Sequence, residues 1–88
     1  MQVEQKPTFR RVYRKLPSNQ RVAVNDAIRI ITESPEIGEV KKGDLSGVYV
    51  YKFDCVNQQY LLAYEWEEGK CLLINLGPHE NFYRDLKR

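Results

Sequence analysis

The spacing of apolar residues changes along this chain from a helical period to a strand period. Residues 7–15 and 20–33 carry apolar side chains at intervals of three and four, which predicts two amphipathic helices. The apolar positions are Phe9, Val12, Tyr13 and Leu16, then Val24, Ala27, Ile28 and Ile31. From residue 48 onward the period becomes two, which predicts strands. Each helix must bury its apolar stripe, so we expect both helices to pack on the sheet.

Proline and glycine residues mark the boundaries of these elements. Pro17 separates the two helices, and Ser18 or Asn19 is expected to cap the second one. Pro35 ends that helix, because the residue before a proline avoids the helical region. Residues 36–47 contain three glycines and are predicted to be a loop.

Short turns join the predicted strands into an antiparallel meander. The three segments are residues 48–54, 60–66 and 70–76. Gly77 and Pro78 are expected to end the last strand, because proline cannot donate to a strand ladder. A short edge strand is also expected at residues 2–5.

These elements predict one α+β domain spanning residues 1–88, in which an N-terminal helical hairpin packs on a small antiparallel sheet. The tail, residues 80–87, is long enough for about two helical turns. The aromatic-rich face of the sheet is expected to cover the helices. Lys52 and Asp54 would then lie on the opposite, wetter face.

Composition restricts the class of protein. A hydrophobic content of 42% and a charged content of 30% fit a folded, soluble chain. No apolar run approaches the length of a membrane span, and residues 1–6 are polar and unlike a signal peptide, so a cytoplasmic location without membrane contact is expected. Cys55 and Cys71 lack metal-site spacing and are interpreted as small buried residues, with a disulfide left open.

Basic residues are clustered although the net charge is only +2. The clusters are Lys6, Arg10, Arg11, Arg14, Lys15 and Arg21, then Lys41 and Lys42, then Arg84, Lys87 and Arg88. One basic side with an anionic partner is therefore expected. Arg10, Arg11 and Arg14 lie off the apolar stripe of their helix, where they suit either a solvated face or RNA contacts.

The only histidine, His79, directly follows the last predicted strand. Tyr83 and Arg84 come a few residues later. An imidazole beside a phenol and a guanidinium has the parts for proton transfer next to a phosphate. The alternative is a solvated histidine on a surface turn.

The order of these elements resembles the RelE/ParE superfamily of bacterial toxins over nearly the whole chain. The matching segments are Glu33-Ser34-Pro35, residues 45–53, residues 59–64 and Asn75-Leu76-Gly77. The resemblance implies the toxin of a type II toxin–antitoxin system, held by a cognate antitoxin protein. It implies no cofactor and no metal.

Two activities occur within that superfamily. RelE, YafQ and HigB-like members cleave mRNA on the ribosome, and ParE-like members inhibit DNA gyrase. Residues 77–83 resemble the tail of YafQ-type toxins, with His79 where RelE has a catalytic arginine, and Lys52 matches a functional RelE lysine. Asp54 and Leu61 replace a lysine and an arginine of RelE, so the gyrase alternative stays open.

The favoured hypothesis is a ribosome-dependent mRNA endoribonuclease that inhibits translation. Its catalytic candidates are His79, Lys52, Tyr83 and Arg84, and its RNA-binding candidates are Lys41, Lys42, Arg10, Arg11 and Arg14. His79 would transfer protons, while Lys52 and Arg84 would stabilise phosphate charge. Tyr83 would stack on a base or bind the phosphate. Asp54 would either orient His79 or act as a second acid or base.

Overall fold

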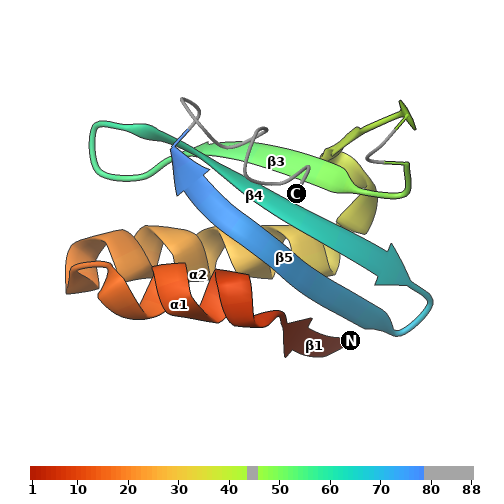
Figure 1. Ribbon diagram of the computed structural model, residues 1–88, viewed down its shortest axis with the longest axis horizontal. Helices are drawn as coiled ribbons and strands as arrows, with labels where there is room; N and C mark the ends of the chain where they lie inside the picture. The colour runs from red at the N-terminus through yellow and green to blue at the C-terminus, as the bar shows by residue number, and fades with distance from the viewer. Residues whose placement is uncertain (44–45, 79–88) are drawn as a thin grey trace.

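Two helices pack on a five-stranded sheet in the computed structural model, which describes residues 1–43 and 46–78 (Figure 1). The helices are α1 (Pro7–Lys15) and α2 (Ser18–Glu33), and a single 3-10 turn, η1 (Pro35–Ile37), follows α2. The α+β class expected from the change in hydrophobic period is confirmed.

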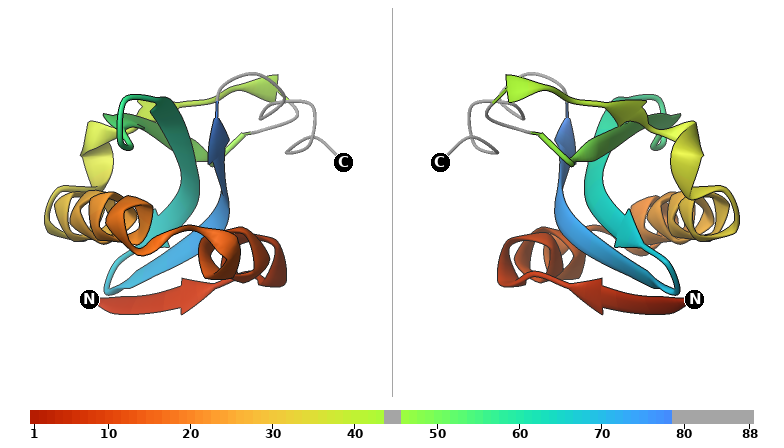
Figure 2. Two further views of the ribbon diagram at one scale, coloured as in Figure 1. Left: turned by 90° about the vertical axis from the view of Figure 1, so that its left-hand side faces the viewer. Right: turned by 90° about the vertical axis from the view of Figure 1, so that its right-hand side faces the viewer.

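The strands lie side by side in the order β1-β5-β4-β3-β2. Their bounds are β1 (Gln2–Gln5), β2 (Glu39–Val40), β3 (Tyr49–Asp54), β4 (Gln59–Glu67) and β5 (Lys70–Pro78). Strands β3, β4 and β5 form the expected antiparallel meander. The expected edge strand β1 is also present, and it pairs parallel to β5. The sheet is therefore mixed. It also curves, so that β1 lies beside α1, while β3 and η1 lie on the side of the molecule where α2 lies (Figure 2).

The core between helices and sheet uses the helical stripes and alternate residues of the central strands. Its buried members include Phe9, Val24, Ala27, Ile31, Tyr60, Leu62, Tyr64, Cys71, Leu73 and Leu76. Tyr49, Tyr51 and Phe53 of β3 pack against this cluster, which confirms that the aromatic-rich face covers the helices.

Three details differ from the sequence expectations. Helix α2 begins at Ser18, and Pro17 holds the capping position with a φ of −59°, so neither Ser18 nor Asn19 is the cap. The Asn19 side chain instead accepts a hydrogen bond from the N–H of Gln20 at 2.9 Å. Pro17 can hold the capping position because its fixed φ suits the entry to a helix.

The loop expected at residues 36–47 contains the end of η1 and the two-residue strand β2. Strand β5 continues through Gly77 to Pro78, which lies opposite Tyr60 of β4. Strand β1 pairs only with residues 70–73 of β5, so no strand among the described residues lies on the other side of Pro78. The missing N–H of this proline therefore removes no bond from the sheet.

The hydroxyl of Tyr64 binds both ends of η1. It donates a hydrogen bond to the carbonyl oxygen of Pro35 at 2.6 Å and accepts one from the N–H of Gly38 at 3.0 Å. A side chain at Gly38 is excluded, because its Cβ would lie 2.5 Å from the Tyr64 oxygen. The position of β2, which begins at Glu39, is therefore set by the central strand β4.

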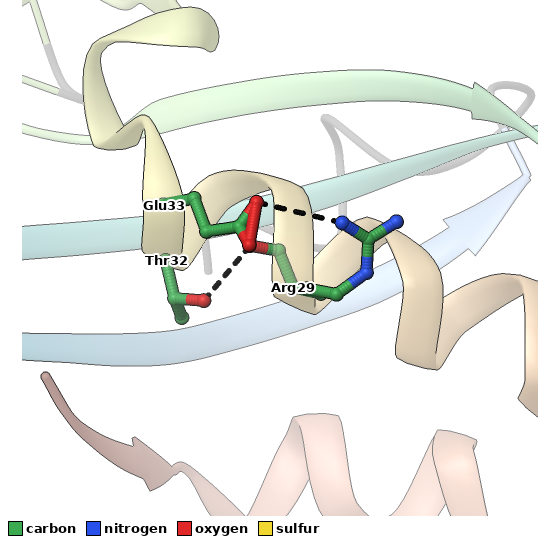
Figure 3. Close-up of polar contacts among 3 residues, drawn as sticks. All are labelled: Arg29, Thr32 and Glu33. Carbon is green, nitrogen blue, oxygen red and sulfur yellow. Dashed lines mark hydrogen bonds and ion pairs between the residues drawn. The ribbon is translucent and has the colours of Figure 1, made fainter.

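Side chains on the exposed face of α2 stabilise its last turn (Figure 3). Nη1 of Arg29 lies 3.4 Å from Oε1 of Glu33, and the Thr32 hydroxyl donates to the carbonyl oxygen of Arg29 at 2.9 Å. Such an exposed pair contributes only about 0.3–0.5 kcal/mol. The end of the helix is therefore fixed mainly by Pro35.

Replacing Tyr64 by phenylalanine tests the hydroxyl without changing the ring. The carbonyl of Pro35 and the N–H of Gly38 would both lose their partner, so Tyr64→Phe should lower the free energy of unfolding by about 1–3 kcal/mol. Tyr49→Phe is the matched control, because the Tyr49 ring stacks on Tyr64 at 5.6 Å. Urea unfolding followed by circular dichroism measures both variants. Equal losses in the two would contradict a special role for the Tyr64 hydroxyl.

The same hydroxyl predicts a pH dependence. Burial raises the pKa of Tyr64 from 10.0 to about 12, partly offset by the hydrogen bond from Gly38. The folded chain keeps this proton to higher pH than the unfolded chain, so the stabilisation is complete below about pH 10 and declines as the pH rises towards about 12. The stability difference between wild type and Tyr64→Phe should shrink across that range in urea titrations. A difference that stays constant would contradict this assignment.

Candidate functional site

The face of the sheet opposite the core carries the sequence-predicted residue Lys52. Lys52 and Asp54 of β3 are exposed, as expected for that face. Lys52 lies opposite Leu61 of β4, and Leu61 lies opposite Gly77 of β5. Lys52 and Gly77 therefore share one row across the sheet, with a single strand between them.

The centre of this face is apolar rather than wet. Val50 is 2% exposed, and Leu61 and Ala63 are fully buried. They form a second cluster with Val48, against which Ile74 packs. The polar surface expected around Lys52 is therefore limited to the margin of an apolar patch.

Acidic and basic side chains at the margin are mixed. Lys41 lies opposite Val48, since its N–H donates to the Val48 carbonyl at 2.9 Å. Nζ of Lys41 pairs with Oε1 of Glu39 at 3.1 Å, which partly neutralises this candidate RNA contact. Lys42 is exposed. Glu39 and Asp54 are acidic, whereas Lys41, Lys42 and Lys52 are basic. The charge on this part of the face is therefore mixed.

Helix α1 carries the other RNA-binding candidates. Arg10, Arg11 and Arg14 are exposed, while Phe9 is buried in the core. Helix α1 packs mainly on β5, and β4 lies between β5 and the strand that carries Lys52. The structure therefore does not gather these arginines and Lys52 into one cluster.

Three of the catalytic candidates, His79, Tyr83 and Arg84, lie outside the described residues. The described chain reaches Gly77, which is buried, and Pro78, which is exposed. Among the described residues, the row that joins Lys52 to Gly77 therefore contains the sheet position nearest in sequence to these candidates.

Asn75 is a residue of this face that the sequence reasoning missed. It lies in the apolar run of β5 opposite Ala63 and is 7% exposed. Its side-chain oxygen accepts a hydrogen bond from the N–H of Leu76 at 2.8 Å. A single amide within an otherwise apolar strand was the sequence feature that distinguished it, because buried amides must be hydrogen-bonded.

A shallow hollow lies at the far end of the sheet, near the turn between β4 and β5. It measures about 160 Å³ and is lined by Glu65, Trp66, Glu67, Lys70 and Leu72. Nε1 of Trp66 is buried there and has no hydrogen-bond partner among the described residues. Within the described residues, none of the sequence-predicted site residues lines this hollow.

Both cysteines are buried, as the sequence predicts. Cys55 and Cys71 are buried free thiols, and burial raises the pKa of each, so both remain protonated near neutral pH. No group of three metal-binding side chains occurs within residues 1–43 and 46–78. Over the same ranges, no helix has the length and hydropathy needed to cross a membrane.

Solved structures with the same fold include toxin–antitoxin proteins. A chain of the Escherichia coli RelBE complex is 23% identical, with a TM-score of 0.72, over 90% of this chain and 96% of its own. A chain of the Mycobacterium tuberculosis RelBE2 complex is 21% identical, with a TM-score of 0.75, over 89% of this chain and 96% of its own. The YoeB/ParE toxin of Agrobacterium tumefaciens is 17% identical, with a TM-score of 0.68, over 90% of this chain and 99% of its own. At these identities the likeness concerns the fold.

Sequence comparison gives the family. No curated protein sequence matches the chain closely enough to count as a relative. The family model described as a ParE-like toxin of type II bacterial toxin–antitoxin systems matches residues 3–87, nearly the full length. The chain therefore belongs to the ParE-like toxins of type II bacterial toxin–antitoxin systems, within the RelE/ParE superfamily.

Proposed function

We propose that this toxin is a metal-independent mRNA endoribonuclease that acts on the ribosome, with its site beside Lys52. The observation that carries the proposal is the row Lys52–Leu61–Gly77. Adjacent strands are about 4.8 Å apart, so the backbones at Lys52 and Gly77 are separated by about 10 Å. His79 follows Gly77 by two residues, which is close enough for both side chains to contact one phosphate group.

The proposed reaction needs three contributions. His79 takes the proton of the 2′-hydroxyl, whose oxygen attacks the adjacent phosphorus, and the bond to the 5′ oxygen breaks. The leaving 5′ oxygen receives a proton from a second proton-transfer group or from water, which balances the proton taken by His79 and gives a 5′-hydroxyl and a 2′,3′-cyclic phosphate. Lys52 and Arg84 stabilise the charge that grows on the phosphoryl oxygens. Tyr83 stacks on a neighbouring base or binds the phosphate.

Asp54 has two proposed roles that the register supports equally. It lies two residues from Lys52 on the same face, at the end of β3. From there its carboxylate either orients His79 or acts as the second proton-transfer group. Lys41 and Lys42, with the three α1 arginines, would contact RNA further from the cleaved bond.

Inhibition of DNA gyrase is the second candidate function. It is favoured by the acidic Asp54, which is exposed on the same face as Lys52 and would repel an RNA phosphate. The name of the matching family model also points to ParE-like toxins.

A cognate antitoxin is the proposed regulatory partner for either activity. The similar chains from E. coli and M. tuberculosis were solved in toxin–antitoxin complexes. Among the described residues, Arg10, Arg11 and Arg14 form no ion pair with an acidic side chain. We infer that an acidic segment of the antitoxin binds this basic part of α1.

Loss of His79 should slow cleavage. His79→Gln keeps hydrogen-bonding capacity but cannot exchange a proton near neutral pH, so cleavage of ribosome-bound message should fall at least about tenfold. The variant should bind the antitoxin as the wild type does. If folded His79→Gln cuts ribosome-bound message at the wild-type rate, the proton-transfer role is wrong.

Removing the charge of Lys52 should reduce cleavage without unfolding the chain. Lys52 is exposed, so Lys52→Gln should change stability by less than about 0.5 kcal/mol, while the cleavage rate falls at least about tenfold. Lys15→Gln, at the exposed end of α1, is the matched control and should cleave normally. Equal cleavage by the two variants would remove Lys52 from the site.

The class of target can be read from cells within minutes of toxin induction. A nuclease should stop translation first and leave message fragments with 2′,3′-cyclic or 3′-phosphate ends. A gyrase inhibitor should leave messages intact and produce DNA breaks with an SOS response. Mapping of transcript ends, together with an SOS reporter, distinguishes the two, and DNA breaks without message ends would overturn the nuclease proposal.

A further inference from the structure

The outer edge of β3 is only partly covered. Strand β2 pairs with Tyr49 and Val50 alone, whereas β4 pairs with all six residues of β3. No strand among the described residues pairs with the outer side of residues 51–54. An uncovered strand edge presents unpaired N–H and C=O groups that a further strand can bind.

The register identifies which backbone groups face outward. In an antiparallel ladder, alternate residues turn both backbone groups towards the same neighbour. The Val48 carbonyl accepts from Lys41 on the β2 side, whereas the N–H of Cys55 donates to Gln58 on the β4 side. Even-numbered residues of β3 therefore face the outer edge, so Lys52 and Asp54 each present an N–H and a C=O there.

The side chains of these two residues carry opposite charges on one face of the strand. Both are exposed. Neither forms an ion pair or a hydrogen bond with another described residue. Edge charges of a single sign repel a second copy of the same strand, but a positive and a negative charge two residues apart complement it.

We propose that two copies of this chain pair antiparallel along this edge, related by a twofold axis at Phe53. Lys52 of each copy then lies opposite Asp54 of the other. The backbones exchange four N–H···O bonds, and the side chains form two ion pairs on the face of the sheet that carries Lys52 and Asp54. The two sheets join into one continuous sheet, and the contact is self-complementary, as twofold symmetry requires.

Other registers are excluded by the structure. Centring the axis on Tyr51 would place the copy's Lys52 opposite Val50, whose outer side is already bound to Glu39. Centring it on Lys52 or Asp54 would place like charges opposite each other. Centring it between residues would pair outward groups with groups that face β4.

The ends of the shared edge are also compatible with the register centred on Phe53. In the register centred on Phe53, Val56 of one copy would come opposite Val50 of the other, where Glu39 already lies. The chain turns away at this point, because Val56 and Asn57 have positive φ values of 54° and 65°. The copy's strand therefore ends just before it would collide with β2. The short overlap predicts a weak, concentration-dependent dimer.

Sedimentation equilibrium of the purified full-length chain, from about 1 µM to about 1 mM, tests the proposal. The wild type should show a reversible monomer–dimer equilibrium that weakens with added salt. Lys52→Asp and Asp54→Lys each place like charges opposite one another at both pairs, and each should raise the dimer Kd at least about tenfold. The double variant restores both pairs and should dimerise like the wild type.

Glu65→Lys is the matched control, since it reverses a charge on the central strand β4, away from the edge, and should leave the dimer unchanged. Circular dichroism checks the fold. If a reversed variant fails to fold, Lys52→Gln or Asp54→Asn takes its place, with a smaller rise in Kd. A wild type that stays monomeric throughout, a dimer that survives both single reversals, or a double variant that does not recover would each overturn the proposal. Because the readout is mass, the result is independent of the proposed nuclease activity.

Discussion

Burial of β4 on both of its faces is the constraint on which the rest of the structure depends. Residues 60–64 are all at most 7% exposed, and the strand is paired along both edges. A charged side chain at such a position needs a partner, because desolvating an unpaired charge is expensive. Leu61, at the position that resembles a RelE arginine, therefore belongs to the packing of this chain. Any catalytic charge on this face must come from its margin, where Lys52 lies.

Tyr64 shows how a polar group is accommodated in this strand. Its ring fills the core, and its hydroxyl reaches out of the sheet to two backbone groups of η1. Without the hydroxyl, the carbonyl of Pro35 and the N–H of Gly38 would have no partner, since neither lies in a strand ladder. The contact links residues 26 to 29 positions apart in sequence, so it joins the helical layer to the sheet at one point.

The sequence was sufficient to predict the helices and the meander, because their hydrophobic periods are clear and prolines mark their ends. It could not predict β2, because its two residues follow a turn whose position depends on the distant Tyr64 hydroxyl. It also could not show that Pro78 is tolerated in β5, because that depends on where β1 stops pairing. Among the site residues, the exposure of Lys52 followed from alternation. The burial of Asn75 did not, because an apolar run gives no indication of which face a polar residue occupies.

Lys52 belongs to both the proposed catalytic site and the proposed dimer edge. The concentration of the toxin would determine which of the two contacts Lys52 makes. A lysine opposite Asp54 of a second copy is neutralised and cannot stabilise a phosphate, so the paired form would be less active. A short edge gives a weak dimer, and mass action then favours the monomer at low toxin levels. Substrate binding at Lys52 would pull the equilibrium further towards the monomer by the same linkage. The alternation of Lys52 and Asp54 at an uncovered edge would thus confine self-association to conditions in which free toxin is abundant.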